Sequence, residues 1–166
     1  YENYSITHDI DFGAYSDYPT DVKIGRLEGN GYTLKNKTIK NVSLIQQVNS
    51  AITDLNFENI NITASGATNV GLIKASNGKI TNCTFKNIYI NNTYNSTVTI
   101  NEIGLITRQN GGSIEDVVLE DITVKTVAKK GNYVAGLVGY YYGVGNMKNI
   151  TATKLEVNGV NYVGGI

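Results

Sequence analysis

The 166-residue chain contains no tryptophan, one histidine (His8), one cysteine (Cys83) and one proline. A single cysteine cannot form an internal disulfide. Only 17% of the residues are charged and the formal net charge is zero, so the chain has no basic field for binding nucleic acid. No apolar run has the length of a membrane span, and we therefore expect no membrane insertion.

Glycine, asparagine, threonine, isoleucine and tyrosine are abundant, a composition that favours many short strands over helices. One short phrase also recurs along the chain. Its copies are Ser43-Leu44-Ile45, Gly71-Leu72-Ile73, Gly104-Leu105-Ile106, Gly136-Leu137-Val138 and the terminal Gly165-Ile166. The second residues of these copies are 28, 33, 32 and 29 positions apart. A period of this order indicates stacked supersecondary units.

The apolar residues keep their order within each unit. Leu55 and Phe57, like Ile60 and Ile62, alternate with polar residues, as in a strand with one buried face. The step from Phe57 to Ile60 breaks the alternation and turns the chain. Repeated short strands predict a solenoid whose coils lie about 4.8 Å apart and pair in parallel. Its interior would contain a column of equivalent residues: Ile52, Ile80, Ile114 and Met147.

Asparagine and aspartate also recur at fixed positions. The three sets are Asn49, Asn77 and Asn110; Asp54, Asn82, Asp116 and Asn149; and Asn59, Asn87 and Asp121. Asparagine tolerates left-handed backbone, and its amide can bond to the copies above and below. We therefore predict polar ladders at the corners of the coil. A carboxylate-rich active site or calcium site is a weaker interpretation because asparagine interrupts each set.

The repeats suggest one domain with a distinct beginning. Residues 1–42 are expected to form an N-terminal cap and first coil, in which Tyr4–Phe12 alternates like a strand and Gly29–Leu34 contains a tight turn. The β-helix repeats would occupy 43–166, as units 43–70, 71–103, 104–135 and 136–164. Because the last phrase stops within a repeat, we expect the chain to be a piece of a longer protein.

Two stretches resemble a known group of proteins. Asn132–Gly139, with the sequence NYVAGLVG, resembles the GLUG repeat of bacterial surface proteins. Asn3–Phe12 followed by Gly25–Leu34 resembles the start of the β-helical region in the same group. That group includes the N-terminal parts of streptococcal immunoglobulin A-cleaving zinc metallopeptidases.

The resemblance implies an all-β fold, a right-handed parallel β-helix of about five coils with an N-terminal lid segment. It also implies an exported bacterial protein, extracellular or attached to the cell surface. It carries over no catalytic residue. The zinc signature His-Glu-x-x-His of the peptidases is absent, and the single His8 cannot supply it.

The remaining reactive side chains have ordinary interpretations. His8 and Asp9 are adjacent on an expected strand and would point to opposite faces, so a catalytic dyad is not expected. Cys83 shares the column of Leu55, which predicts a small buried hydrophobe rather than a nucleophile. The acidic cluster of the N-terminal region, which offers a calcium site only as an alternative, contains Asp9, Asp11, Asp17 and Asp21. Stacked charges on an exposed face are expected at Glu58, Lys86 and Glu120.

The strongest binding candidate is Tyr140-Tyr141-Tyr142. Three consecutive tyrosines cannot all point inward, and an exposed tyrosine offers rigid, amphipathic contact area for protein or sugar. At these positions we expect the other units to have Lys74, Ala75 and Ser76, or Thr107, Arg108 and Gln109. The alternative is that the tyrosines stack on a neighbouring coil or cover the glycine-rich bulge that follows them.

We therefore expect a non-catalytic module without metal or cofactor. It would act as a spacer and would offer a binding face for a host or matrix glycoprotein or glycan, within a larger parent chain that is an immunoglobulin-cleaving metallopeptidase or a relative. The alternative is an enzyme of the polysaccharide lyase or glycosidase type, which would need carboxylates clustered with arginine or lysine on one face. Only Arg26 and Arg108 are arginines.

Overall fold

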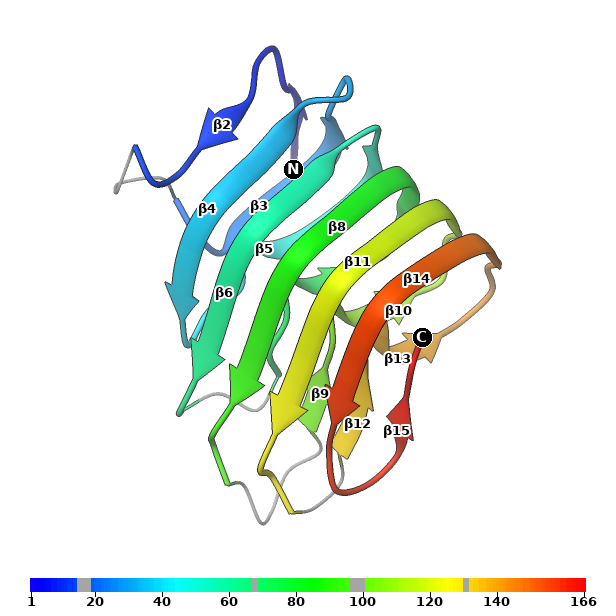
Figure 1. The fold of residues 1–166 in the computed structure, drawn as a ribbon. Helices are drawn as coiled ribbons and strands as arrows, with labels where there is room; N and C mark the ends of the chain where they lie inside the picture. The colour runs from blue at the N-terminus through cyan, green and yellow to red at the C-terminus, as the bar shows by residue number, and fades with distance from the viewer. Residues whose placement is uncertain (15–18, 67–68, 96–100, 130–131) are drawn as a thin grey trace.

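The computed structural model describes residues 1–14, 19–66, 69–95, 101–129 and 132–166. In these ranges the regular structure consists of strands, without helices (Figure 1). In chain order the strands are β1 (Glu2–Ser5), β2 (Ile10–Asp11), β3 (Val22–Glu28), β4 (Thr33–Lys40), β5 (Ile45–Thr53), β6 (Asn56–Ala64), β7 (Ile73–Ser76), β8 (Lys79–Asn92), β9 (Asn101–Ile103), β10 (Ile106–Asn110), β11 (Ile114–Thr126), β12 (Asn132–Ala135), β13 (Val138–Tyr142), β14 (Met147–Asn158) and β15 (Val163–Gly164). No helix of the described residues has the length and apolarity needed to cross a membrane.

The described strands pair in parallel, each with the equivalent strand of the next repeat. Figure 1 shows β4, β6, β8, β11 and β14 side by side as one curved face. Ile80 pairs with both Ile52 and Ile114, and Ile114 pairs with Met147. The predicted column is therefore present in register. The protein is all-β, and its parallel repeats have a β-helix-like arrangement.

Two shorter sets of strands complete each repeat. The strands β5, β7, β10 and β13 pair in that order, and β9, β12 and β15 form a separate three-stranded sheet. These strands lie behind the long curved face in Figure 1. The recurring Gly-Leu phrase connects the two sets, since Gly104-Leu105 joins β9 to β10 and Gly136-Leu137 joins β12 to β13.

Asparagine and aspartate occupy the bends, as predicted. The left-handed backbone, with φ between 51° and 58°, is found at Asp54, Asn82, Asp116, Asn149, Asn59, Asn87 and Asp121. Their amides also bond from coil to coil. Asn149 donates to Asp116 over 2.8 Å, and Asn87 donates to Asn59 over 2.6 Å. In the first set, Asn110 donates to Asn77 over 3.2 Å, so polar contacts between coils are present in all three predicted sets.

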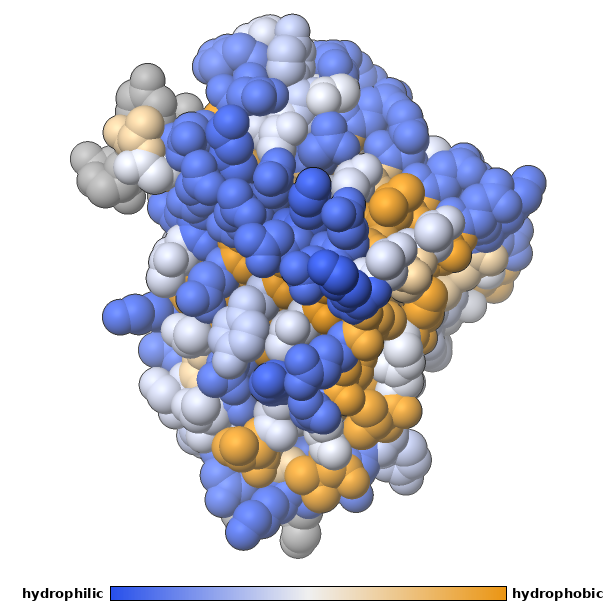
Figure 2. All heavy atoms as spheres, in the orientation of Figure 1, coloured by the Kyte–Doolittle hydropathy of each residue, from blue (hydrophilic) through white to orange (hydrophobic). Residues whose placement is uncertain are grey.

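The aliphatic columns meet in one core that runs along the stack. Phe57 and Phe85 occupy the same level of neighbouring coils, and their rings are stacked with centroids 5.1 Å apart. Met147, the last residue of the column that contains Ile52, Ile80 and Ile114, is 39% exposed, although we expected it to be interior. The reason is that β14 pairs with β11 on one side only among the described strands. Figure 2 shows hydrophobic residues gathered toward the side where β14 lies.

The N-terminal region departs from its predicted strand. Tyr4–Phe12 is not continuous, because β1 pairs with β3 whereas β2 pairs with β4. The turn between β3 and β4 is tight, with positive φ at Asn30 and Gly31. However, these two strands pair with β5 and β6 rather than with each other. The segment before residue 42 therefore contributes parallel strands to the same stack.

Candidate functional site

The three tyrosines lie on β13, and the strand register corrects their alignment with the other coils. Tyr140, Tyr141 and Tyr142 pair with Arg108, Gln109 and Asn110 of β10, one position later than we expected. Tyr140 lies three residues after Leu137, just as Arg108 lies three residues after Leu105, so the shared Gly-Leu phrase gives the observed partners. This register places Tyr140 beside the cation of Arg108.

Tyr141 points inward and does not belong to the exposed surface. It packs against the core, and its hydroxyl donates to the carbonyl of Gly112 over 2.6 Å. Burial raises the pKa of this hydroxyl. A side chain at the neighbouring Gly145 would collide with the Gly112 carbonyl and with the Tyr141 hydroxyl. Tyr141 therefore covers the glycine-rich bulge, as the alternative interpretation proposed.

Tyr140 and Tyr142 point the other way and line a hollow of about 320 Å³. Tyr142 is 66% exposed, and Tyr140 is half-buried. The described residues that line this hollow are Glu102, Arg108, Asn110, Tyr133, Tyr140 and Tyr142. We call this set the tyrosine hollow. It combines aromatic rings, one acid, one cation and one amide.

The tyrosine hollow is built by the Gly-Leu corner. Glu102 precedes Gly104-Leu105 on β9, and Arg108 follows it on β10, so a single corner brings both side chains to one side. Tyr133 and Tyr140 flank Gly136-Leu137 in the same way one coil later.

Glycine is needed at this corner because adjacent coils approach closely. A Cβ on Gly71 would lie 2.3 Å from the carbonyl oxygen of Gly104, and one on Gly104 would lie 2.9 Å from the amide nitrogen of Gly139. Inside the corner, the amide of Asn101 on β9 donates to Asn132 on β12 over 2.8 Å. The recurring glycine is therefore a packing requirement of the stack rather than a catalytic signature.

Glu102 and Arg108 form a close ion pair. Arg108 Nη2 lies 2.5 Å from Glu102 Oε1, and Nε lies 2.9 Å from Oε2. The Glu102 side chain is only 3% exposed, whereas that of Arg108 is 46% exposed. The hydrogen bonds to Glu102 raise the pKa of the guanidinium. The buried carboxylate thus anchors a cation whose outer part faces solvent.

Aromatic rings lie beside this ion pair. The Arg108 guanidinium lies 5.8 Å from the centroid of the Tyr140 ring, within the range of a cation–π contact. Tyr133 and Tyr140 have centroids 5.3 Å apart with their planes inclined at 59°. Tyr133 also stacks on Tyr162, at 5.1 Å and 17°. Tyr133 and Tyr140 are therefore held in defined positions, while Tyr142 projects into solvent.

Sequence reasoning missed most of this site. Arg108 was noted as a rare arginine and as a counterpart of the tyrosines in another unit, but not as a binding residue, and Glu102 and Tyr133 were not singled out. The available signal was spacing. Glu102 lies three residues before Leu105, and Arg108 three residues after it. Tyr133 and Tyr140 likewise stand a few residues before and after the next corner, and in both coils the two side chains meet.

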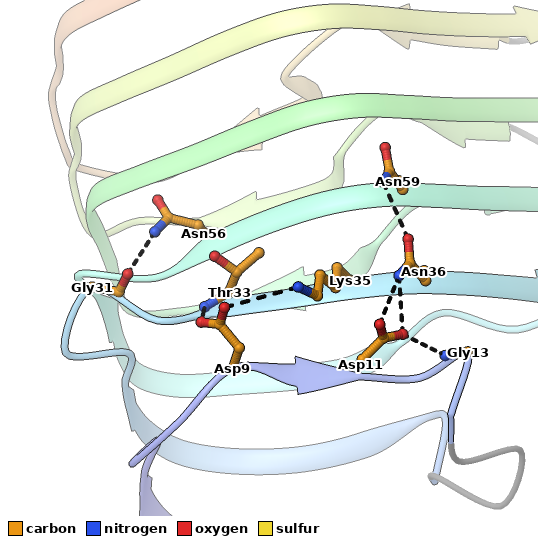
Figure 3. Close-up of polar contacts among 9 residues, drawn as sticks. All are labelled: Asp9, Asp11, Gly13, Gly31, Thr33, Lys35, Asn36, Asn56 and Asn59. Carbon is orange, nitrogen blue, oxygen red and sulfur yellow. Dashed lines mark hydrogen bonds and ion pairs between the residues drawn. The ribbon is translucent and has the colours of Figure 1, made fainter.

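Two acidic residues of the N-terminal region, Asp9 and Asp11, bind to residues of the neighbouring coil. Asp9 accepts the Thr33 amide over 3.0 Å and lies 3.9 Å from Lys35 Nζ. Asp11 accepts the Asn36 amide over 3.0 Å and the Gly13 N–H over 2.9 Å, as Figure 3 shows. These bonds, that of Asn36 first, lower the pKa of the Asp11 carboxyl.

The other members of the acidic cluster do not join them. Asp21 lines a separate hollow with Asn41 and Lys74, and Asp17 lies outside the described residues. Within the described part of the chain, no three His, Cys, Asp or Glu residues are grouped to hold a metal ion.

The other candidates have the ordinary roles that we predicted. His8 is exposed, and its Nδ1 contacts the Thr7 hydroxyl at 3.2 Å. Cys83 is buried in the core, and burial raises the pKa of its thiol to about 12. Lys86 pairs in register with Glu58 and Glu120 and lies 3.8 Å from the Glu120 carboxylate. Lys86 and Glu120 therefore belong to a solvated face.

No protein-family model and no curated protein matches the chain. Among solved structures, the chain is similar to the crystal structure of a putative immunoglobulin A1 protease from Bacteroides ovatus. The match covers 98% of this chain and 72% of that chain, with 13% sequence identity and a TM-score of 0.46. The GLUG resemblance therefore rests on the sequence motifs alone.

Proposed function

We propose that this chain is a non-catalytic module of an exported bacterial surface protein, built as a right-handed parallel β-helix of about five coils. Its role is to act as a spacer and to present a binding face to a host or matrix glycoprotein or glycan. The parallel register of Ile52, Ile80 and Ile114 supports a stacked module of this kind. A stack of coils presents an extended and repetitive surface, which suits recognition more than it suits chemistry.

The tyrosine hollow is the observation that carries the binding role. Tyr140 and Tyr142 project from one face of β13, and the Glu102–Arg108 pair lies beside them. Tyrosine and arginine are, with tryptophan, enriched among the residues that contribute most to binding at protein surfaces. Tyrosine offers a large contact area with little loss of conformational entropy. Tyr141 takes no part, since its hydroxyl is satisfied inside the fold.

The parent assignment rests on the motifs Asn132–Gly139 and Asn3–Phe12. Under this assignment, the module is an accessory region of an immunoglobulin-cleaving zinc metallopeptidase or a relative. The full gene product tests this part. A His-Glu-x-x-His motif elsewhere in the product would support it, and a product without a zinc motif would overturn it.

One observation favours the enzyme alternative, namely that an arginine and a carboxylate meet beside tyrosine hydroxyls in the tyrosine hollow. Glycosidases generally use two carboxyl groups, and the hollow supplies one, which Arg108 already binds. The binding role therefore fits the geometry better. Incubating the chain with pectin, alginate and glycosaminoglycans tests the alternative, since measurable turnover would overturn the non-catalytic assignment.

The binding role is tested with the 166-residue chain and two tyrosine variants. Tyr140→Ser combined with Tyr142→Ser should abolish binding on a glycan array and in an immunoglobulin A pull-down. Tyr89→Ser is the matched control, because Tyr89 is 37% exposed but lies on β8, outside the tyrosine hollow. Binding that survives in the double variant, or that is absent in the unmodified chain, would refute the proposal.

A further inference from the structure

We infer that the tyrosine hollow binds one uncharged sugar unit of a glycan, with the outer edge of Arg108 and the amide of Asn110 as its polar contacts. This inference rests on the proposed binding role and narrows its ligand class. It adds Glu102, Arg108, Asn110 and Tyr133 to the tyrosines predicted from the sequence.

The first argument concerns the N–H donors of the Arg108 guanidinium. Its hydrogen bonds to described residues leave from Nε and Nη2, and both reach Glu102. Arginine carries five N–H donors, so the Nη1 edge keeps its two for a ligand. Glu102 and the Tyr140 ring hold the guanidinium in place, which means that a ligand meets donors that are already oriented.

The second argument is charge. Arg108 is the one cation among the described residues that line the tyrosine hollow, and Glu102, which is 3% exposed, neutralises it at 2.5 Å. An anionic ligand would gain little attraction from this neutral pair and would lose hydration on entering. An uncharged ligand with several hydroxyl groups can use the same donors without that loss of hydration.

The third argument is the alternation of apolar and polar contact area. Tyr133 and Tyr140 line the hollow, although Tyr162 stacks on one face of Tyr133 and Arg108 lies over the ring of Tyr140. The remaining ring surface provides the fixed apolar area against which the C–H face of a pyranose packs. Asn110 donates its amide N–H to Asn77, so its side-chain carbonyl oxygen can accept a hydrogen bond from a ligand hydroxyl. Sugars present this combination of a C–H face and a rim of hydroxyls.

The fourth argument is size. A hollow of about 320 Å³ is at the lower end of the range for small-molecule sites, which suits one ring rather than a long chain lying in a groove. Tyr142, at the solvent side, then contacts the next part of the glycan or the protein that carries it.

The experiment is a glycan array containing both uncharged and acidic glycans, followed by calorimetry with the best uncharged glycan at low and high salt. We expect binding to uncharged glycans that changes little with ionic strength, because no net charge is screened. Arg108→Lys keeps a positive charge beside Glu102 but removes the planar fork, so affinity should fall about tenfold or more, and thermal unfolding checks that the variant is folded. Tyr142→Ser, at an exposed position, should also weaken binding, and Tyr89→Ser should not.

The outcomes separate this inference from the broader proposal. Binding only to sialylated, sulfated or uronic glycans with a steep salt dependence would overturn the uncharged ligand and leave the binding role intact. Binding of immunoglobulin A that survives removal of its glycans, and that is lost in Tyr142→Ser, would overturn the sugar ligand but not the binding role. Unchanged affinity in Arg108→Lys would also overturn the inference. No binding by the unmodified chain would overturn both.

Discussion

Arg108 on β10 donates to Glu102 on β9, with Nη2 and Oε1 2.5 Å apart, although the two residues stand on opposite sides of the Gly104-Leu105 corner. The pair joins two strand sets that belong to separate sheets. It therefore ties the corner together at the place where the coil carries its candidate binding site.

Removing the cation from this pair should destabilise the fold. Arg108→Ala leaves the carboxylate of Glu102 buried without its partner, and we expect a loss of about 1–3 kcal/mol, less than for a fully buried pair because Arg108 is half-exposed. Arg26→Ala is the control, since Arg26 and Glu28 pair at 2.7 Å at the surface and should contribute less than about 1 kcal/mol. Urea unfolding of both variants measures the difference. Equal losses would contradict the anchoring role of Glu102.

The glycine of the recurring phrase should not tolerate a side chain. In Gly71→Ala the new Cβ would meet the Gly104 carbonyl oxygen at 2.3 Å, and backbone atoms cannot rotate away. We expect a loss of about 1–3 kcal/mol in the free energy of unfolding. Gly164→Ala, whose nearest contact would be at 3.8 Å, should change stability by less than about 0.5 kcal/mol. A stable Gly71→Ala would show that the coils are not stacked this closely.

One corner position carries a residue that suits it poorly. Lys154 has a φ of 54°, at the level where the coils below have Asp121 and Asn87. Lysine gains nothing from left-handed backbone, whereas asparagine tolerates it and can bond to Asp121. Lys154→Asn should therefore stabilise the protein by about 0.5–1 kcal/mol. Lys148→Asn, at a strand position without positive φ, should not, and thermal unfolding of the two variants compares them.

Cys83 should stay unreactive in the folded protein and should make stability depend on pH above 9. Burial raises the pKa of the folded thiol from 9.0 to about 12, so between these values the unfolded chain loses a proton that the folded chain keeps. The free energy of unfolding then falls as pH rises, by at most about 1.4 kcal/mol per unit from this group. Below pH 9 both states hold the proton, and the thiol contributes no slope.

Cys83→Ala isolates that slope from the titration of tyrosine and lysine. The stability of the unmodified chain relative to the variant should decline between pH 9 and pH 12, and a native thiol assay at pH 8 should label Cys83 only after unfolding. Rapid labelling of the folded protein would disprove the buried position.

The stack could be predicted because its causes are local and repeated. Ile52, Ile80 and Ile114 recur with the same apolar neighbours, and a column in register is the arrangement that buries all of them. Asn59 and Asn87 mark bends because few other residues adopt positive φ at low cost. Met147 was misjudged, since the order of the sequence does not say whether another strand covers a residue. The partners of the tyrosines were misaligned by one position, which on a strand changes every facing side chain.

By itself, the sequence determined the parallel repeat, the apolar columns and the polar corners, because each depends on residue types at a nearly constant period. Only the tertiary structure decided that Glu102, Arg108, Tyr133 and Tyr140 share one hollow and that Tyr141 leaves it. The physical reason is that a corner brings together side chains from before and after it, and from the next coil, so their neighbourhood depends on how the chain turns and stacks.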